Sequence, residues 1–150
     1  MGSTLTNLVA YIIFGTKNRF PVIAETIEPR LYEYMGGIIR GEGSILLAIG
    51  GMPDHIHVLA KIRANQSMVE MVKRIKGNSS RWINDNRLVD EHFGWQDGYG
   101  AFSVSQSQCD LVKQYILGQK EHHKKRTFQE EFVDFLAKQG IEFNEKYLWS

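Results

Sequence analysis

A short turn between two apolar runs is the feature that most constrains the fold of this chain. The turn has the sequence Gly-Gly-Met-Pro-Asp at residues 50–54, and such a cluster of glycine, proline and aspartate interrupts regular structure. The runs on either side, residues 44–49 and 55–62, are rich in aliphatic side chains and have the length of strands. Two strands joined by so short a turn pair as a hairpin, so the chain is expected to build an antiparallel sheet.

Two more strands and two helices surround this hairpin. Residues 8–14 form an apolar run typical of a buried strand, and residues 99–104 form a shorter, aromatic-rich one. Apolar residues recur at helical spacing within residues 25–39 and again after Ser67, where Glu70 completes a capping-box pattern. The predicted order is strand, helix, strand, strand, helix, strand. Its simplest closure is an α+β, ferredoxin-like βαββαβ fold, with an antiparallel sheet and helices on one face.

Two further helices are predicted after the last strand. Ser107, with Asp110 three positions later, is expected to begin a helix that runs to about Lys125. Residues 128–138 suggest one more short helix. No repeat, low-complexity tract or linker divides the 150 residues, so residues 1–150 are expected to form a single domain.

Composition excludes several classes of protein. Hydrophobic residues make up 43% and charged residues 23%, which argues against disorder and against a membrane span. The single cysteine, Cys109, cannot form an intramolecular disulfide or a cysteine-based zinc cluster, which suggests a reducing cytoplasm.

The net charge of +1 hides an uneven distribution. Residues 61–87 hold seven basic side chains against two acidic ones, and residues 113–126 hold five against one. These blocks either present one basic face to phosphates or form two solvated helix faces.

The pair His55 and His57 is the first candidate for chemistry. On a strand, alternate side chains share a face, so the two imidazoles are expected to lie about 6.6–6.8 Å apart along it. Ile56 and Val58 would then point into the core on the opposite face. Two histidines so placed can converge on one divalent ion, each through one ring nitrogen. The alternative is a pair of exposed histidines on the solvated face of the sheet.

Tyr115 and Gln119 are the second candidate. They stand four residues apart in the predicted helix and would share one of its faces, which His122 and His123 extend. A phenol has a pKa near 10, so Tyr115 needs a base or a cation nearby to act as a nucleophile. The alternative for this tyrosine is a place at the edge of the core.

The third candidate is the aromatic segment at residues 95–105, Trp-Gln-Asp-Gly-Tyr-Gly-Ala-Phe-Ser-Val-Ser. Its aromatic side chains either stack on unpaired bases or simply fill a turn and a strand.

Taken together, these motifs resemble the small single-strand transposases of insertion sequences. These are the HUH tyrosine type, which includes the REP-associated tyrosine transposases. The matching features are Thr16-Lys17-Asn18-Arg19, Gly51-Met52-Pro53-Asp54-His55-Ile56-His57, residues 95–105, and Tyr115-Ile116-Leu117-Gly118-Gln119 with His122-His123. They occur in the family's order and are spread over most of the chain.

The resemblance implies a site and a reaction. His55, His57 and Gln119 would bind Mg²⁺ or Mn²⁺, and Tyr115 would attack a DNA phosphodiester. The product is a 5′-phosphotyrosine link and a free 3′-hydroxyl, which later reverses the reaction on another strand. The resemblance also implies a homodimer acting on single-stranded DNA with hairpins at the element ends, with sites that can be composite between subunits.

Elementary chemistry agrees with these roles. A cation neutralises charge that builds on phosphate oxygens, and two imidazoles with an amide oxygen leave its charge undiminished. A cation near Tyr115 would also favour the phenolate. The basic blocks would hold the phosphates of the strand, with Lys73, Lys76 and Arg81 as expected contacts.

Two other functions compete with transposition. One is a DNA-hairpin-binding protein of the same fold without transposition activity. The other is a metal-dependent phosphoesterase that uses water, which would keep His55 and His57 but would not need Tyr115.

Overall fold

The computed structural model describes residues 2–122, 127–138, 140, 142 and 144. Its strands and helices follow the order predicted from the sequence. They are β1 (Leu8–Gly15), α1 (Glu28–Gly41), β2 (Ile45–Met52), β3 (His55–Ile62), α2 (Met68–Asp85), β4 (Gly100–Ser103), α3 (Cys109–Leu117), α4 (Gln119–His122) and α5 (Phe128–Lys138). Two short 3-10 turns, Lys17–Arg19 and Gln106–Gln108, follow β1 and precede α3.

The four strands form one antiparallel sheet in the order β2-β3-β1-β4. This is the strand order of a ferredoxin-like fold, so the predicted α+β class is confirmed. The two strands at the centre, β1 and β3, pair along their full length from Leu8 opposite Ile62 to Gly15 opposite His55. The two histidines of β3 are therefore held in the interior of the sheet.

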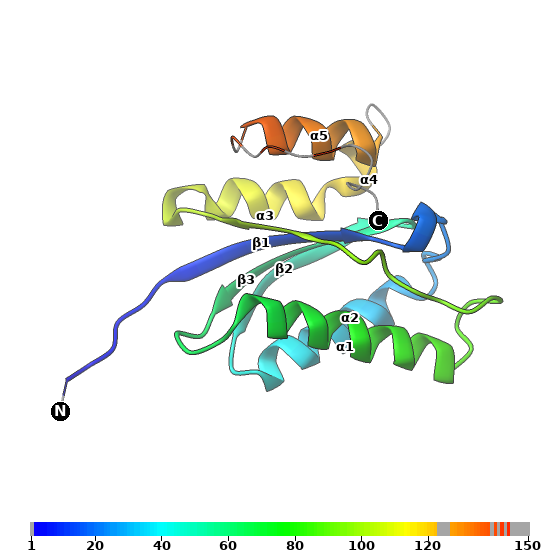
Figure 1. Cartoon of the computed structure of the whole chain (residues 1–150), viewed down its shortest axis with the longest axis horizontal. Coiled ribbons are helices and arrows are strands. Elements are labelled where there is room, and N and C mark those ends of the chain that lie inside the picture. Colours follow the sequence, from blue (N-terminus) through cyan, green and yellow to red (C-terminus); the bar gives the residue numbers. More distant parts are fainter. Residues whose placement is uncertain (1, 123–126, 139, 141, 143, 145–150) are drawn as a thin grey trace.

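Helices cover both faces of this sheet, as Figure 1 shows. On one face α1 and α2 enclose the larger core, into which Ile56 and Val58 of β3 point, as predicted. On the opposite face α3 and α5 pack over Tyr11 and Leu59 in a second core. Helices were predicted on one face of the sheet, with two further helices after the last strand; these C-terminal helices, among them the one that carries Tyr115, form the second layer. His55 and His57 are both 0% exposed, so the alternative of two solvated histidines is excluded.

The prediction of one helix from Ser107 to Lys125 is wrong. The chain makes the 3-10 turn, then α3, and then breaks at Gly118 before α4. Ser107 does not cap α3, whose N-cap residue is Gln108 without a side-chain cap bond. Residue 125 lies outside the described residues. Glycine at 118 is unfavourable within a helix, so α3 ends there. After this break the side chain of Gln119 is directed toward His55 of the sheet. Ser67, by contrast, caps α2 as predicted, since its Oγ accepts a hydrogen bond from the Glu70 amide at 3.3 Å.

A glycine in β2 allows α3 to approach the sheet very closely. Gly50 is the cross-strand partner of His57, and a Cβ atom added at Gly50 would lie 2.4 Å from the main-chain oxygen of Ile116. Any larger residue at this position would push α3 away from the sheet. Gly50 therefore sets the distance between α3 and the face of the sheet that carries His55 and His57.

We predict that Gly50→Ala lowers the free energy of unfolding by about 1–3 kcal/mol, because the added methyl group overpacks the contact between β2 and α3. The matched control is Gly37→Ala in α1, where an added Cβ meets nothing within 4 Å. That control should stabilise the protein by about 0.5–1 kcal/mol, as expected for glycine to alanine in a helix. Urea unfolding of the two variants checks both values. Equal effects at the two positions would refute a tight contact at Gly50.

Candidate metal and nucleophile site

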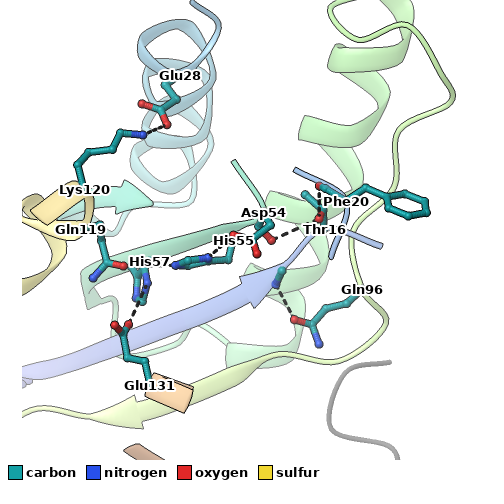
Figure 2. Close-up of polar contacts among 11 residues, drawn as sticks. Thr16, Phe20, Glu28, Asp54, His55, His57, Gln96, Gln119, Lys120 and Glu131 are labelled. Carbon is teal, nitrogen blue, oxygen red and sulfur yellow. Dashed lines mark hydrogen bonds and ion pairs between the residues drawn. The ribbon is translucent and has the colours of Figure 1, made fainter. Parts of the chain in front are cut away.

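The two histidine rings lie side by side on the face of the sheet covered by α3, α4 and α5. Their centroids are 4.8 Å apart, and their planes meet at 76°. Because the residues alternate along β3, the strand itself directs both rings to the same side. Figure 2 shows the rings between Asp54, which directly precedes β3, and the side chains of Gln119 and Glu131.

Each ring is held through its Nδ1 atom. His55 Nδ1 lies 2.7 Å from Asp54 Oδ1, and His57 Nδ1 is hydrogen-bonded to Tyr11 Oη. With Nδ1 protonated, His55 donates to the carboxylate and His57 donates to the phenol oxygen. Nε2 of each ring then carries the lone pair that can bind a metal ion, which is the usual arrangement of metal-binding histidines.

The phenol of Tyr11 is kept neutral by its surroundings. Burial raises the pKa of Tyr11 well above its ordinary value, and the neighbouring Tyr115 and Glu131 raise it further. Tyr11 also stacks on the His57 ring, with centroids 5.6 Å apart and an interplanar angle of 22°. It therefore fixes both the hydrogen bonding and the orientation of this ring.

Gln119 approaches the first histidine from α4. Its Oε1 lies 3.3 Å from His55 Nε2, and its Nε2 donates to the main-chain oxygen of Tyr115 at 3.2 Å. That second bond directs the amide oxygen toward the imidazole. The next residue, Lys120, binds Glu28 of α1 with Nζ 2.5 Å from Oε1, which ties α4 to the start of α1 (Figure 2).

Tyr115 lies on α3 beside the second histidine. Its side chain is half-buried, and its ring packs edge-on against His57 with centroids 6.0 Å apart. The structure thus brings Tyr115, Gln119, His55 and His57 of a single chain to one place. Gln119 arrives there across the break at Gly118. The side chain of His122 and all of His123 lie outside what the structure describes.

A carboxylate that the sequence analysis missed completes the cluster. Glu131 of α5 places Oε1 3.8 Å from His57 Nε2, and one ligand atom from each of His55, His57 and Glu131 lies within 4.8 Å of the others. The sequence did contain a signal for it. Glu131 is an acid in the apolar stripe of the predicted helix, next to Phe132 and four residues before Phe135.

These donors fit a divalent cation. Two imidazole nitrogens, an amide oxygen and a carboxylate oxygen converge from β3, α4 and α5. Oxygen donors suit Mg²⁺ and Mn²⁺, and imidazole is a common ligand of transition metals. A carboxylate only 8% exposed is also favoured by a positive charge in the same space.

The predicted DNA contacts lie on α2, which covers the opposite face of the sheet. Lys73 and Arg81 are exposed there, and their contacts with phosphate stay a prediction. Lys76 differs, because its Nζ donates to the main-chain oxygens of three consecutive residues, Gln96, Asp97 and Gly98, at 2.5, 3.1 and 3.1 Å. Burial lowers the pKa of this ammonium, an effect opposed by the Asp97 carboxylate. In this structure Lys76 holds a loop in place.

The aromatic segment is largely structural. Trp95 is buried and donates from Nε1 to Ser79 Oγ at 2.9 Å, and Phe102 is buried in the second core. Tyr99 remains 37% exposed and lines a groove of about 470 Å³ with Lys73. Of these three rings, Tyr99 alone is exposed enough to stack on a base.

The Thr16–Arg19 motif lies beside the histidine site. The Thr16 amide donates to the main-chain oxygen of Asp54 at 2.9 Å, and Asn18 and Arg19 have φ angles of 58° and 55°. Asparagine adopts this left-handed conformation readily, whereas it is strained for Arg19. Asn18 and Arg19 line a polar cavity of about 290 Å³ together with Asp54.

Comparison with known proteins assigns the family. Residues 4–119 match the family described as "Transposase IS200 like". The chain belongs to the IS200-like transposase family. A curated relative is the ISDra2 transposase TnpA of Deinococcus radiodurans, 25% identical over 116 residues that make up 74% of this chain and 83% of the relative. The resemblance to HUH tyrosine transposases is therefore confirmed.

Solved structures of transposases share the fold. One is a crystal structure of a candidate transposase from Deinococcus radiodurans, with a TM-score of 0.65 and 24% identity over 79% of this chain and 95% of that one. Another is a REP-associated tyrosine transposase bound to a REP hairpin, with a TM-score of 0.62 and 14% identity over 82% of this chain and 72% of that one. Among the described residues, no helix of this IS200-like chain is long and apolar enough to cross a membrane.

We predict that Asp54→Asn weakens Mn²⁺ binding about 10–100-fold, because the His55 ring loses the carboxylate that orients it. Isothermal titration calorimetry measures the affinity directly. Asp97→Asn, at an exposed aspartate on the other side of the sheet, makes the same chemical change and should leave the affinity unaltered. Equal affinities in both variants would show that Asp54 does not support a metal site.

Proposed function

We propose that this chain is a DNA transposase that cuts and rejoins single-stranded DNA at insertion-sequence ends through a 5′-phosphotyrosine intermediate. Tyr115 is the nucleophile, and His55, His57 and Gln119 hold a Mg²⁺ or Mn²⁺ ion. The observation that carries this proposal is the packing of the Tyr115 ring against His57 within one chain. Membership of the IS200-like family supports it independently.

The reaction exchanges one phosphoester for another. Tyr115 Oη bonds to phosphorus as the bond from phosphorus to the 3′-oxygen breaks. The phenol loses its proton, and the departing 3′-oxygen gains one. When bound, the cation neutralises charge on the phosphate oxygens and favours the phenolate. The chain's own residues orient the participants: Asp54 and Tyr11 hold the imidazoles, and Gly50 lets α3 carry Tyr115 close to them.

The proposed substrate is single-stranded DNA that carries a hairpin. A relative of the same fold was solved bound to a REP hairpin, and this chain has exposed basic residues on α2, Lys73 and Arg81, suited to phosphates. We propose that the single-domain protein acts in the cytoplasm as a homodimer. Since Tyr115 already lies beside His57 of its own chain, the dimer need not exchange catalytic helices to complete each site.

The test is formation of a covalent protein–DNA adduct. Labelled single-stranded DNA with the element ends is incubated with protein and Mg²⁺ and run on a denaturing protein gel. We predict a shifted, heat-stable band that is lost in Tyr115→Phe, which lacks only the attacking oxygen. Tyr99→Phe, at an exposed tyrosine on the other face, is the matched control and should keep the band.

Two results would contradict the proposal. Cleavage without a covalent band, retained in Tyr115→Phe, would identify water as the nucleophile and the protein as a phosphoesterase. Hairpin binding with neither band nor cleavage would identify a DNA-binding protein without transposition activity.

A further inference from the structure

Glu131 lies in the site although it belongs to a part of the chain that the family match does not cover. The match ends at residue 119, whereas Glu131 lies in the first turn of α5, Phe128–Lys138. Figure 2 shows its carboxylate directed at His57. A contribution from this residue would therefore come from outside the matched region.

The docking of α5 fixes the position of this carboxylate. Phe132 and Leu136 are buried in the second core, and Phe135 packs edge-on against Tyr11 with centroids 5.2 Å apart. Phe135 also packs edge-on against Phe102, with ring centroids 4.7 Å apart. Glu131 lies on this sheet-facing side of the helix and is 8% exposed, so an acid has been placed where an apolar residue would be expected.

The spacing of the donor atoms suits one ion. In an octahedral site with bonds of about 2.1 Å, neighbouring donors lie about 3 Å apart and opposite donors about 4.2 Å apart. Here His57 Nε2 and Glu131 Oε1 are 3.8 Å apart, and the largest separation among the three ligand atoms is within 4.8 Å. A small inward movement of the side chains would bring all of them to bonding distance.

We propose that Glu131 is a direct ligand of the divalent cation, so that the site holds His55, His57, Gln119 and a carboxylate from α5. This inference rests on the proposed function, because it takes the histidines as metal ligands. Four protein donors leave two of six positions for substrate oxygens. The carboxylate increases affinity for the ion and removes part of its positive charge. Metal binding and the docking of α5 are then coupled.

The test is Mn²⁺ titration by calorimetry on the full chain. Glu131→Gln keeps the shape of the side chain and removes its charge, and we expect the affinity to fall at least about 10-fold. Glu130→Gln makes the same change at the exposed neighbouring residue and should not alter the affinity. Circular dichroism confirms that both variants are folded. His55→Ala serves as the reference for losing one histidine ligand of the proposed site.

Amide hydrogen exchange gives a second readout on the unsubstituted protein. Mn²⁺ should slow exchange across α5, and this protection should disappear in Glu131→Gln. If Mn²⁺ binds normally to Glu131→Gln, or leaves exchange in α5 of the unsubstituted protein unchanged, the inference is overturned. If His55→Ala fails to bind Mn²⁺ while Glu131→Gln binds it normally, the proposed function stands, but Glu131 is not a ligand. If the unsubstituted protein binds no Mn²⁺ at all, both the inference and the metal site of the proposed function are wrong.

Discussion

The close approach of α3 to β2 at Gly50 is the contact on which the site depends. Gly50 pairs with His57 across the sheet, and the Ile116 main chain lies directly over it. Since Ile116 follows Tyr115, the same contact sets the distance between the phenol and the imidazole. The break at Gly118 then lets Gln119 turn toward His55. One small residue in the sheet therefore determines how two helices meet the histidines.

Burial of the histidines on the second face has chemical consequences. A half-covered sheet would leave both rings in water, where each would hydrate and rotate. Under α3 and α5 the rings are instead held by Asp54 and Tyr11, which leaves Nε2 of each facing the helices. An environment with little water also strengthens the interaction between a bound cation and a substrate phosphate. The second helical layer thus prepares the site as well as stabilising the fold.

Local sequence patterns were sufficient for most of the fold. The limits of β3 and of the helix at 128–138 agree with the prediction, because a period of two and a period of 3.6 are both clear in those segments. The end of α3 was not predictable in this way. Residues 119–127 carry no apolar side chain, so periodicity does not mark where the helix ends, and the chain after Gly118 is positioned by packing against β2 and by the ion pair between Lys120 and Glu28.

The candidate site, too, was predictable from the sequence only in part. The histidines, Tyr115 and Gln119 were accessible from motifs because they lie in short stretches with recognisable spacing. Glu131 was not, since its approach to His57 arises from the docking of a helix 74 residues further along the chain. The phosphate contact of Lys76 stays a prediction, but the sequence did not show that its ammonium donates to three main-chain carbonyl oxygens of a distant loop.

The most direct test of this account is the position of a metal ion in crystals of the protein grown with Mn²⁺, located by its anomalous scattering. We expect one peak between the Nε2 atoms of His55 and His57, within bonding distance of the Gln119 amide oxygen. The Tyr115 hydroxyl should face the same space. A peak elsewhere, or no peak at saturating Mn²⁺, would contradict the claim that this face of the sheet is a metal-dependent transposase site.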